Sequence, residues 1–439
     1  MKHKAVSWSV AVIVAGVCGL AWLRAEPNLA PAPVTTTTTP LHEGAEATTR
    51  ATISADAAPL IDRIDTAYRD LTTLDLGGTV GADFDVEGKR EQHRDAFTAA
   101  LLRPDKFCHE LAGDVIIGSN GQRIYLQQPA KNEYIQTRLS DGKLALQAIP
   151  RSLREVLMSQ NPSLFLALAD SARDVLTLGG GKIDKGADAV IDGVSYPTIM
   201  LALADGSQTN MLAVDPKTGL LRRVEYDLAP MFRKRGANDV IKALIRVDYT
   251  TIVPNALLGD ERFAWSPPEG ARDVALAAAE EHNSKVRAAA LVGKPAPVFE
   301  LKDLKGETVS LEKLKGSVVV IDFWATWCGP CLPSLMHLNK VYADYAPRGV
   351  KVYAVDLGEE KAQVEAFVAE KELKMPVLLD SDEAVSNAYL LDGPPLSFVI
   401  GKDGVVKKVF SGYNEMSSED ILRDAIDAAL AEPAEKAGE

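Results

Sequence analysis

The sequence predicts a multidomain protein in which an α+β domain with a curved antiparallel sheet precedes a smaller α/β domain. Its 439 residues exceed the size of one ordinary hydrophobic core. Residues 51–269 alternate strand patterns and turn signals with only a few helical stretches, as an antiparallel meander does. Residues 292–432 alternate strands with helices around the continuous apolar run Val318–Ile321, which is typical of a central parallel strand.

Residues 1–25 predict an export signal or a membrane anchor. Lys2 and Lys4 precede the uncharged stretch 5–23, which is long for a cleaved signal and just long enough to span a bilayer. We therefore expect the lysines to stay in the cytoplasm and the rest of the chain to be periplasmic or otherwise extracytoplasmic, either released by cleavage or tethered to the inner membrane. The Pro- and Thr-rich residues 26–50 cannot bury a core and predict a linker.

The composition excludes several functions. A formal net charge of -13 offers no basic surface to neutralise phosphates, so we expect no nucleic-acid partner. The chain has only four cysteines, too few for a scaffold held together by disulfides. Cys328 and Cys331 form the only candidate redox pair, whereas Cys108 is expected to be a buried apolar residue without a partner. No cofactor is expected.

The domain at 51–269 should begin with a helix, because Leu60, Ile61, Ile64, Tyr68 and Leu71 fall on one helical face. The strand patterns that follow lie at 80–86, 114–119 and 122–126 around an Asn-Gly turn, 132–137, 194–203, 208–214, 220–227 and 241–251, with helical stretches at 153–158 and 163–176. This order predicts an antiparallel sheet with helices on one side.

Three short motifs in this domain carry a resemblance. They are Asn120–Tyr125, the turn Asp215–Gly219, and Phe263–Gly270 with its Ser-Pro-Pro-Glu-Gly ending. Together they resemble the LolA/LolB-like carriers of outer-membrane lipoproteins. The resemblance implies a half-barrel whose concave apolar face takes a lipid or acyl chain. The alternative is that the same apolar residues fill a closed core.

The alanine-rich residues 270–291 predict a helical connector to the second domain. That domain should contain a hairpin near 305–306, the strand at 318–321, a helix opening at Cys328, a strand at 350–356, a helix at 361–371, strands at 375–379, 396–400 and 405–410, and a final helix at 418–430. Parallel strands linked by helices predict an α/β sandwich. Residues 433–439 are expected to be a frayed tail.

Cys328-Gly-Pro-Cys331 is the strongest functional signal. Two cysteines three residues apart at a helix start lie on one turn, so a disulfide between them can close and open. The free N–H groups and dipole of a helix N-terminus lower a thiol pKa from about 8.5 to about 7 or below. We expect Cys328 to attack and Cys331 to resolve the mixed disulfide. Gly329 leaves room beside the attacking sulfur, and Pro330 suits a first helical turn.

The run Phe323–Cys331 resembles the active site of thioredoxin-fold proteins, and Lys294–Leu301 resembles the opening of the redoxin or TlpA/ResA branch. The likeness extends over about residues 292–430. It implies a thioredoxin fold and thiol-disulfide oxidoreductase activity. Ser334 stands where that branch usually has a glutamate, so no role of that glutamate is transferred to this chain.

The resemblance also assigns residues around the cysteines. Asp322 matches the buried acid that assists deprotonation of the second cysteine, and burial would raise its pKa for that work. Pro395 matches the cis-proline that faces the cysteine pair, and Pro394 precedes it at the site. Trp327 is expected to shape the site surface. The alternative for Asp322 is a satisfied buried carboxylate without catalytic duty.

Two other uses of the cysteines are disfavoured. A CxxC pair can be half of a zinc site, but this chain has no second pair and its six histidines show no ligand spacing, so we expect no metal. A peroxiredoxin needs a threonine or serine three residues before its cysteine, where this chain has Ala325.

These patterns predict an exported thiol-disulfide oxidoreductase acting on protein disulfides. The Gly-Pro dipeptide resembles reducing thioredoxins, whose potentials lie near about -270 mV against about -120 mV for strong oxidants, and so favours a reductant fed by a membrane electron donor. Apocytochromes are an example of the exported proteins whose disulfides such an enzyme would reduce. The alternative is a lipid or lipoprotein carrier with an accessory redox domain. A redox-inactive scaffold is the third reading.

Overall fold

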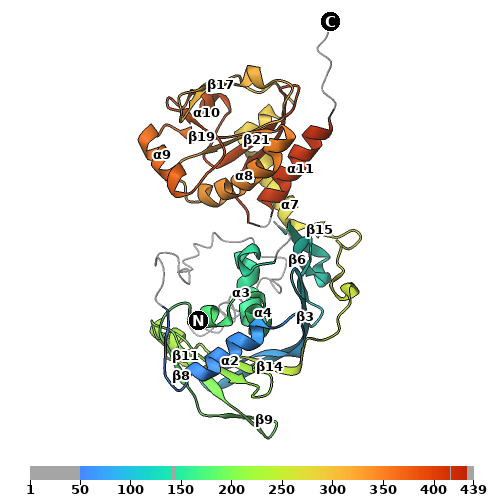
Figure 1. Cartoon of the computed structure of the whole chain (residues 1–439), viewed down its shortest axis with the longest axis vertical. Helices are drawn as coiled ribbons and strands as arrows, with labels where there is room; N and C mark the ends of the chain where they lie inside the picture. Colours follow the sequence, from blue (N-terminus) through green and yellow to red (C-terminus); the bar gives the residue numbers. More distant parts are fainter. Residues whose placement is uncertain (1–49, 140–143, 416, 433–439) are drawn as a thin grey trace. The chain divides into compact units, whose positions relative to one another are not determined.

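The computed structural model describes residues 50–139, 144–415 and 417–432 (Figure 1). Contacts divide the chain into two compact units, one holding the chain up to Lys131 and Leu139–Pro267, the other Asn132–Arg138 and Pro268 onwards. The predicted signal or anchor, nearly all of the linker and the tail lie outside the described residues. Within the described ranges, no helix is both long and apolar enough to cross a membrane.

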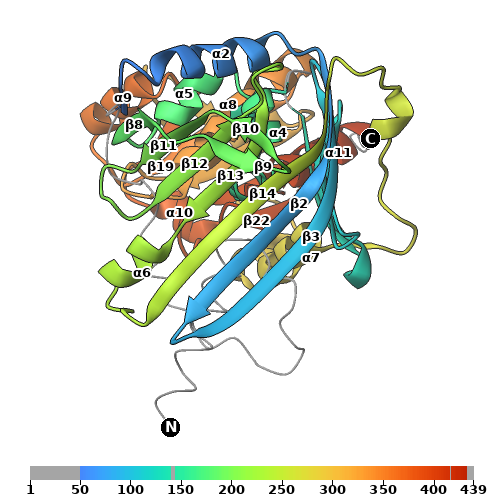
Figure 2. The ribbon, with the colours of Figure 1, turned by 90° about the horizontal axis from the view of Figure 1, so that it is seen from below.

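A large sheet forms the first unit. Its strands are β1 (Thr52–Ile53), β2 (Thr73–Val86), β3 (Lys89–Leu102), β4 (Lys106–Leu111), β5 (Val115–Asn120), β6 (Arg123–Gln128), β8 (Lys182–Lys185), β11 (Thr198–Ala202), β12 (Thr209–Val214), β13 (Leu221–Asp227) and β14 (Val240–Pro254). Their order is β1-β8-β11-β12-β13-β14-β2-β3-β4-β5-β6. Only β1 and β8 pair in parallel, whereas the long strands β14, β2 and β3 run antiparallel side by side (Figure 2). The predicted large antiparallel sheet is therefore present.

Helices pack on one face of this sheet (Figure 1). They are α2 (Ala58–Arg69), α3 (Arg151–Gln160), α4 (Pro162–Leu168), α5 (Ala172–Thr177) and α6 (Ala229–Lys234), and a separate hairpin is formed by β9 (Ala189–Ile191) and β10 (Val194–Tyr196). Every residue of α4 is buried. Tyr249 of β14 accepts a hydrogen bond from the Ser163 N–H and donates one to the Asn161 side chain. The face under α4 is thus filled by protein.

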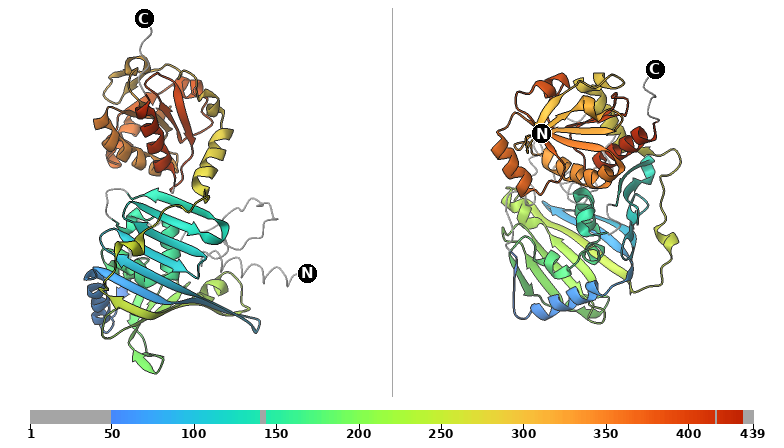
Figure 3. Two further views of the ribbon diagram at one scale, coloured as in Figure 1. Left: turned by 90° about the vertical axis from the view of Figure 1, so that its right-hand side faces the viewer. Right: turned by 45° about the horizontal axis from the view of Figure 1, so that its top comes forward.

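The second unit contains a mixed sheet. Its strands are β16 (Glu300–Asp303), β17 (Thr308–Ser310), β18 (Val319–Trp324), β19 (Lys351–Leu357), β20 (Val377–Asp380), β21 (Leu396–Ile400) and β22 (Val406–Ser411), in the order β17-β16-β20-β19-β18-β21-β22. The helices are α7 (Val274–Lys285), α8 (Cys331–Tyr345), α9 (Lys361–Glu370), α10 (Ala384–Ala388) and α11 (Ser418–Ala431). The right-hand view of Figure 3 shows strands of this sheet between helices.

Strand β18 is the centre of this unit, and all of its residues are buried. It pairs in parallel with β19 and antiparallel with β21. Alternate side chains enter two cores: Val318, Val320 and Trp324 pack with α8, α9 and α11, whereas the core on the other face holds Ile321 and Phe323. The continuous apolar run predicted this two-faced burial.

Residues 132–138 differ from the expected domain assignment. The sequence pattern places this strand in the first domain, but β7 (Glu133–Arg138) pairs in parallel with β15 (Arg272–Asp273) and groups with the second unit. The backbone N–H of Arg138 also donates to the Asp420 carboxylate on α11. Hydrogen bonding across a long sequence separation, which periodicity does not reveal, accounts for the difference.

Candidate active site

Cys328 and Cys331 are joined by a disulfide, with their Cα atoms 5.3 Å apart. The Cys331 N–H donates to the Cys328 carbonyl at 3.1 Å, which closes the turn between them. Helix α8 begins at Cys331 rather than at Cys328, with Pro330 as its N-cap. Cys328 is 6% exposed and Cys331 is fully buried, so only the first sulfur is within reach of another protein.

The N-terminus of α8 favours a negative charge beside it. No side chain from the described ranges caps this end of the helix, so its first N–H groups point towards the turn that carries Cys328 without a capping carboxylate. Gly329 adds open space: a Cβ built there would meet nothing within 4 Å among the described residues. The surface over the turn is therefore accessible.

Asp322 lies on the face of the sheet that carries the cysteines. It falls between Val320 and Trp324 on β18, and both of these side chains share a core with Cys328 and Cys331. Burial raises the pKa of Asp322 to about 6, against the opposing effect of a hydrogen bond from the Ser397 hydroxyl. The second carboxylate oxygen, Oδ2, has no donor among the described residues. This acid can therefore gain or lose a proton near neutral pH.

Pro395 lies at the same end of the sheet. The Pro394–Pro395 peptide bond is cis, and Pro395 is buried immediately before β21. In the antiparallel pairing of β18 and β21, Leu396 is the partner of Phe323. Pro395 is therefore next to the point where β18 ends and the cysteine loop begins.

The two tryptophans of the motif have different environments. Trp324 is fully buried, and its ring centroid lies 5.2 Å from that of Phe367 on α9. Trp327 is 67% exposed, directly before Cys328. An exposed aromatic ring of this size is a suitable contact surface for a protein partner.

Sequence reasoning missed one cluster at this site. The Glu359 carboxylate accepts hydrogen bonds from the Thr326 N–H at 2.5 Å and the Thr326 hydroxyl at 2.6 Å. Gln363 donates to both Glu359 and Thr326 at 2.7 Å. Asp356, at the end of β19, accepts the Glu359 N–H at 3.2 Å. The sequence signal that could have revealed this cluster is Asp356 at the end of the apolar strand β19, because the carboxyl ends of parallel strands lie together at one edge of a sheet.

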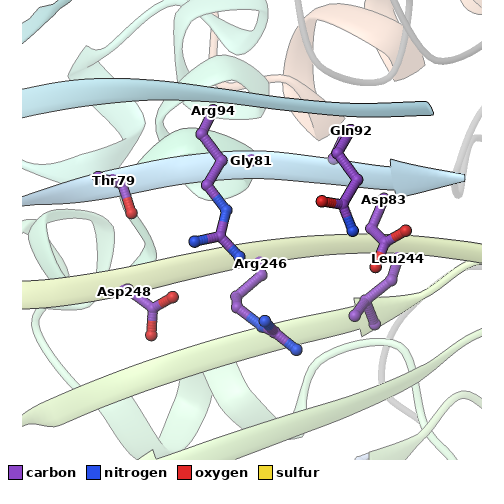
Figure 4. A pocket seen from close by; sticks show the side chains of 9 residues that line it. Thr79, Gly81, Asp83, Gln92, Arg94, Leu244, Arg246 and Asp248 are labelled. Carbon is purple, nitrogen blue, oxygen red and sulfur yellow. The ribbon is translucent and has the colours of Figure 1, made fainter. Parts of the chain in front are cut away.

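The first unit offers a weaker candidate on its sheet. A small hollow near Gly81 is lined by Asp83, Arg94, Arg246 and Asp248, among others (Figure 4). Its volume is about 10 Å³, room for about one water molecule. Arg246 pairs with Glu225 at 2.7 Å and Asp248 with Arg223 at 2.5 Å, so much of its charge is already balanced. We assign it no ligand.

Other reactive groups are sparse in the part of the chain that the structure describes. Cys108 of β4 is a free thiol whose pKa is raised, chiefly by burial, which makes it a poor nucleophile at neutral pH. No group of three or more His, Cys, Asp or Glu in the described ranges is arranged to hold a metal ion.

Comparison with known proteins supports the assignment of the second unit. The AhpC/TSA family model matches residues 292–409. The thiol-disulfide oxidoreductase ResA of Geobacillus kaustophilus (strain HTA426) is 39% identical over 137 residues, which are 31% of this chain and 78% of that protein. ResA of Bacillus subtilis (strain 168) is 35% identical over 146 residues, or 33% of this chain and 79% of that protein. The predicted thioredoxin fold of the C-terminal domain is confirmed.

Among solved structures, a thiol:disulfide interchange protein of the thioredoxin family from Chlorobium tepidum TLS is 27% identical to this chain. The match covers 31% of this chain and 96% of that chain, with a TM-score of 0.29.

Proposed function

Through its C-terminal domain the chain belongs to the ResA family of thiol-disulfide oxidoreductases, and we propose that it reduces disulfides of extracytoplasmic proteins through Cys328 and Cys331. The observation that carries this proposal is the pairing of a reachable Cys328 with a buried Cys331 at the start of α8. The exposed Trp327 and the cis Pro394–Pro395 bond would frame the client beside them.

In the reducing direction, the Cys328 thiolate attacks one sulfur of the client disulfide. The other client sulfur leaves as a thiolate and takes a proton from water, and a mixed disulfide joins the two proteins. Cys331 then attacks the Cys328 sulfur, and its thiol proton passes to Asp322. The second client sulfur leaves and is protonated. Two electrons have moved to the client, and the enzyme is left with the disulfide present in this structure.

Repeated turnover requires a donor that returns two electrons to this disulfide. A membrane reductase is the donor class that suits an extracytoplasmic enzyme with an N-terminal export signal or tether at 1–25. The Gly329-Pro330 dipeptide supports the reducing direction, since it is also found in thioredoxins of low potential.

Trapping tests the proposal. In cells, Cys331→Ser should leave Cys328 joined to its client, and mass spectrometry of the reducible adduct would identify that client. Cys328→Ser should give no adduct and should abolish reduction of insulin disulfides. Cys108→Ser is the matched control and should behave as the wild type. Adducts of equal yield with Cys328→Ser, or full insulin reduction by it, would refute the proposed chemistry.

A second candidate function, lipid or lipoprotein carriage, rests on the large curved sheet of the first unit with helices on one face (Figure 2). Against it, all seven residues of α4 are buried, so an acyl chain could enter only after this helix moves. Native mass spectrometry of protein purified without detergent tests whether the first unit carries a lipid. We expect no lipid; a bound acyl chain that is lost in Leu164→Trp would favour the carrier.

A further inference from the structure

Asp356 and Glu359 lie together beneath the loop that leads to Cys328. The Glu359 side chain holds that loop by accepting from both the N–H and the hydroxyl of Thr326, two residues before Cys328. Asp356 is 1% exposed and accepts the Glu359 N–H. These contacts join the end of β19 directly to the redox loop.

The acid pair faces the same side of the sheet as the cysteines. Asp356 is the register partner of Trp324 on the parallel strand β18, so both side chains point to the face that carries α8. The Trp324 indole N–H and Asp356 Oδ2 are both buried without a hydrogen-bond partner among the described residues. Oδ2 of Asp322, two residues before Trp324 in the sequence, is likewise buried without a hydrogen-bond partner among the described residues. Buried polar atoms left in this way call for an explanation.

A retained proton explains the unpartnered oxygen of Asp356. Oδ1 of Asp356 accepts the Glu359 N–H, but the buried Oδ2 has no donor among the described residues. An ionised carboxylate can only accept hydrogen bonds, so burial of an oxygen without a donor favours the protonated acid. Burial, and after it the neighbouring Glu359, raises the pKa of Asp356 to about 7. Asp356 is therefore mostly neutral in mild acid and ionised in mild base.

We propose that Asp356 and Glu359 are a positioning pair for Cys328, in which Glu359 holds the Thr326 turn and the buried carboxyl group of Asp356 sets the charge that the Cys328 sulfur meets when it ionises. This inference rests on the proposed function of Cys328 as the attacking thiol. Glu359 acts on Cys328 through the loop that it holds, and Asp356 acts through its charge.

The sign of the effect follows from charge. Loss of the Asp356 proton adds a negative charge near Cys328, which disfavours its thiolate, so ionisation of the thiol and ionisation of Asp356 oppose each other. Other ionisable groups on the packed elements are Asp322 on β18, Asp380 on β20, Glu383, whose carboxylate lies beside Gly358, the α9 N-cap Glu360, and Lys361 and Glu365 on α9. Of these, Lys361 pairs with Glu365, and Asp380 accepts the N–H groups of Val385 and Ser386. Replacing Asp356 by a group that does not titrate should therefore leave the Cys328 titration with a single inflection.

The experiment measures the rate at which the reduced full-length protein reacts with iodoacetamide from pH 5 to 10. Cys331→Ser is the background, so that only Cys328 and the poorly reactive Cys108 remain. The wild-type pair should give a profile with a second inflection near neutral pH. Asp356→Asn keeps the shape and removes the titration, so the inflection should disappear and the Cys328 pKa should fall by about half a unit, roughly a threefold gain in thiolate at mildly acidic pH.

Glu360→Gln, which removes an exposed carboxylate one residue from the pair, is the matched control and should leave the profile unchanged. Glu359→Gln keeps an oxygen for Thr326 and removes the charge that helps to raise the pKa of Asp356, so the inflection should move to lower pH, which covers the case in which Asp356→Asn fails to fold. Superimposable profiles for the wild type and the folded variants would overturn the inference, as would an equal shift in Glu360→Gln. Alkylation needs no client, so this outcome is independent of the insulin and trapping assays.

Discussion

The Ser397 hydroxyl donates a hydrogen bond to Oδ1 of the buried Asp322, across the antiparallel pairing of β18 and β21. Asp322 Oδ2 has no donor among the described residues. The hydrogen bond from Ser397 stabilises the ionised carboxylate, but it does not offset the cost of burying the charge. The pKa of Asp322 therefore rises to about 6. Strand pairing therefore sets the proton affinity of the acid beside the cysteines.

Asp322 should make the folded state less stable as the pH rises. Its pKa is raised from 3.8 to about 6 on folding, so the native state keeps a proton that the unfolded state has released, and stability falls between these two pH values. Asp322→Asn should therefore be more stable than the wild type by up to about 3 kcal/mol at pH 7.5 and nearly equal to it below pH 4. Urea unfolding of the oxidised protein measures this. The exposed Glu312→Gln is the control, and equal stabilities at pH 7.5 would contradict the burial argument.

Ser397→Ala should raise the pKa of Asp322 further, because the hydrogen bond from Ser397 lowers it. A lost hydrogen bond to a charged group corresponds to about one pKa unit. If Asp322 must be ionised to accept the Cys331 proton, the rising limb of insulin reduction against pH should move upward by about that amount. Ser411→Ala on the neighbouring strand β22 is the control, and an unmoved limb in Ser397→Ala would argue against Asp322 as the proton acceptor.

Trp327→Ala should impair reduction of protein disulfides without unfolding the enzyme. The side chain is 67% exposed, so its loss should change stability by no more than about 0.5 kcal/mol. We expect KM for insulin to rise several-fold while the rate with a small disulfide such as oxidised glutathione is unchanged, since only a protein is large enough to contact the indole. Val298→Ala removes an equally exposed apolar side chain and should have no effect on either substrate. An equal loss of activity with insulin and with oxidised glutathione would mean that Trp327 affects the reactivity of the cysteines and not the binding of a protein substrate.

His109 should make the first unit sensitive to acid. It is fully buried, its Nε2 donates to Gln160 at 3.2 Å, and burial lowers its pKa to about 4. The native state therefore excludes a proton that the unfolded state binds below about pH 6.5, so the stability present above that pH is lost as the pH falls towards 4, by up to about 3 kcal/mol. Hydrogen exchange in α4 should accelerate over this range and should do so much less in His109→Gln. The exposed His93→Gln is the control, and acid-insensitive exchange in the wild type would contradict this account.

The centre of the C-terminal domain could be predicted because its signals are local. Val318–Ile321 is apolar without alternation, which only a strand buried on both faces explains, and Cys328-Gly-Pro-Cys331 follows it at the carboxyl end. The expected order of exposure, with Cys328 more exposed than Cys331, is also observed. The resemblance to thioredoxin-fold proteins then implied the thiol-disulfide oxidoreductase activity that the relatives confirm.

Features that depend on strand pairing or on tertiary contacts could not be predicted from the sequence. Strand β3 was not predicted because its first six residues, Lys89–Arg94, are exposed and show no alternation; backbone hydrogen bonds to β2 hold them. The helix predicted at 163–176 breaks into α4 and α5, since Ser171 caps a new helix by accepting the Asp174 N–H. The Asp356–Glu359 pair meets Thr326 only after β19 is placed beside β18.

Titration of the Cys328 thiol tests the central claim most directly. Thiolate absorbance of the reduced Cys331→Ser protein would be followed from pH 4 to 10, with the Cys328→Ser, Cys331→Ser double variant subtracted to remove Cys108. An attacking thiol at the N-terminus of α8 should ionise with a pKa of about 7 or below, against about 8.5 for an unperturbed cysteine. A pKa at or above the unperturbed value would contradict the proposal that the start of α8 activates Cys328 for disulfide exchange.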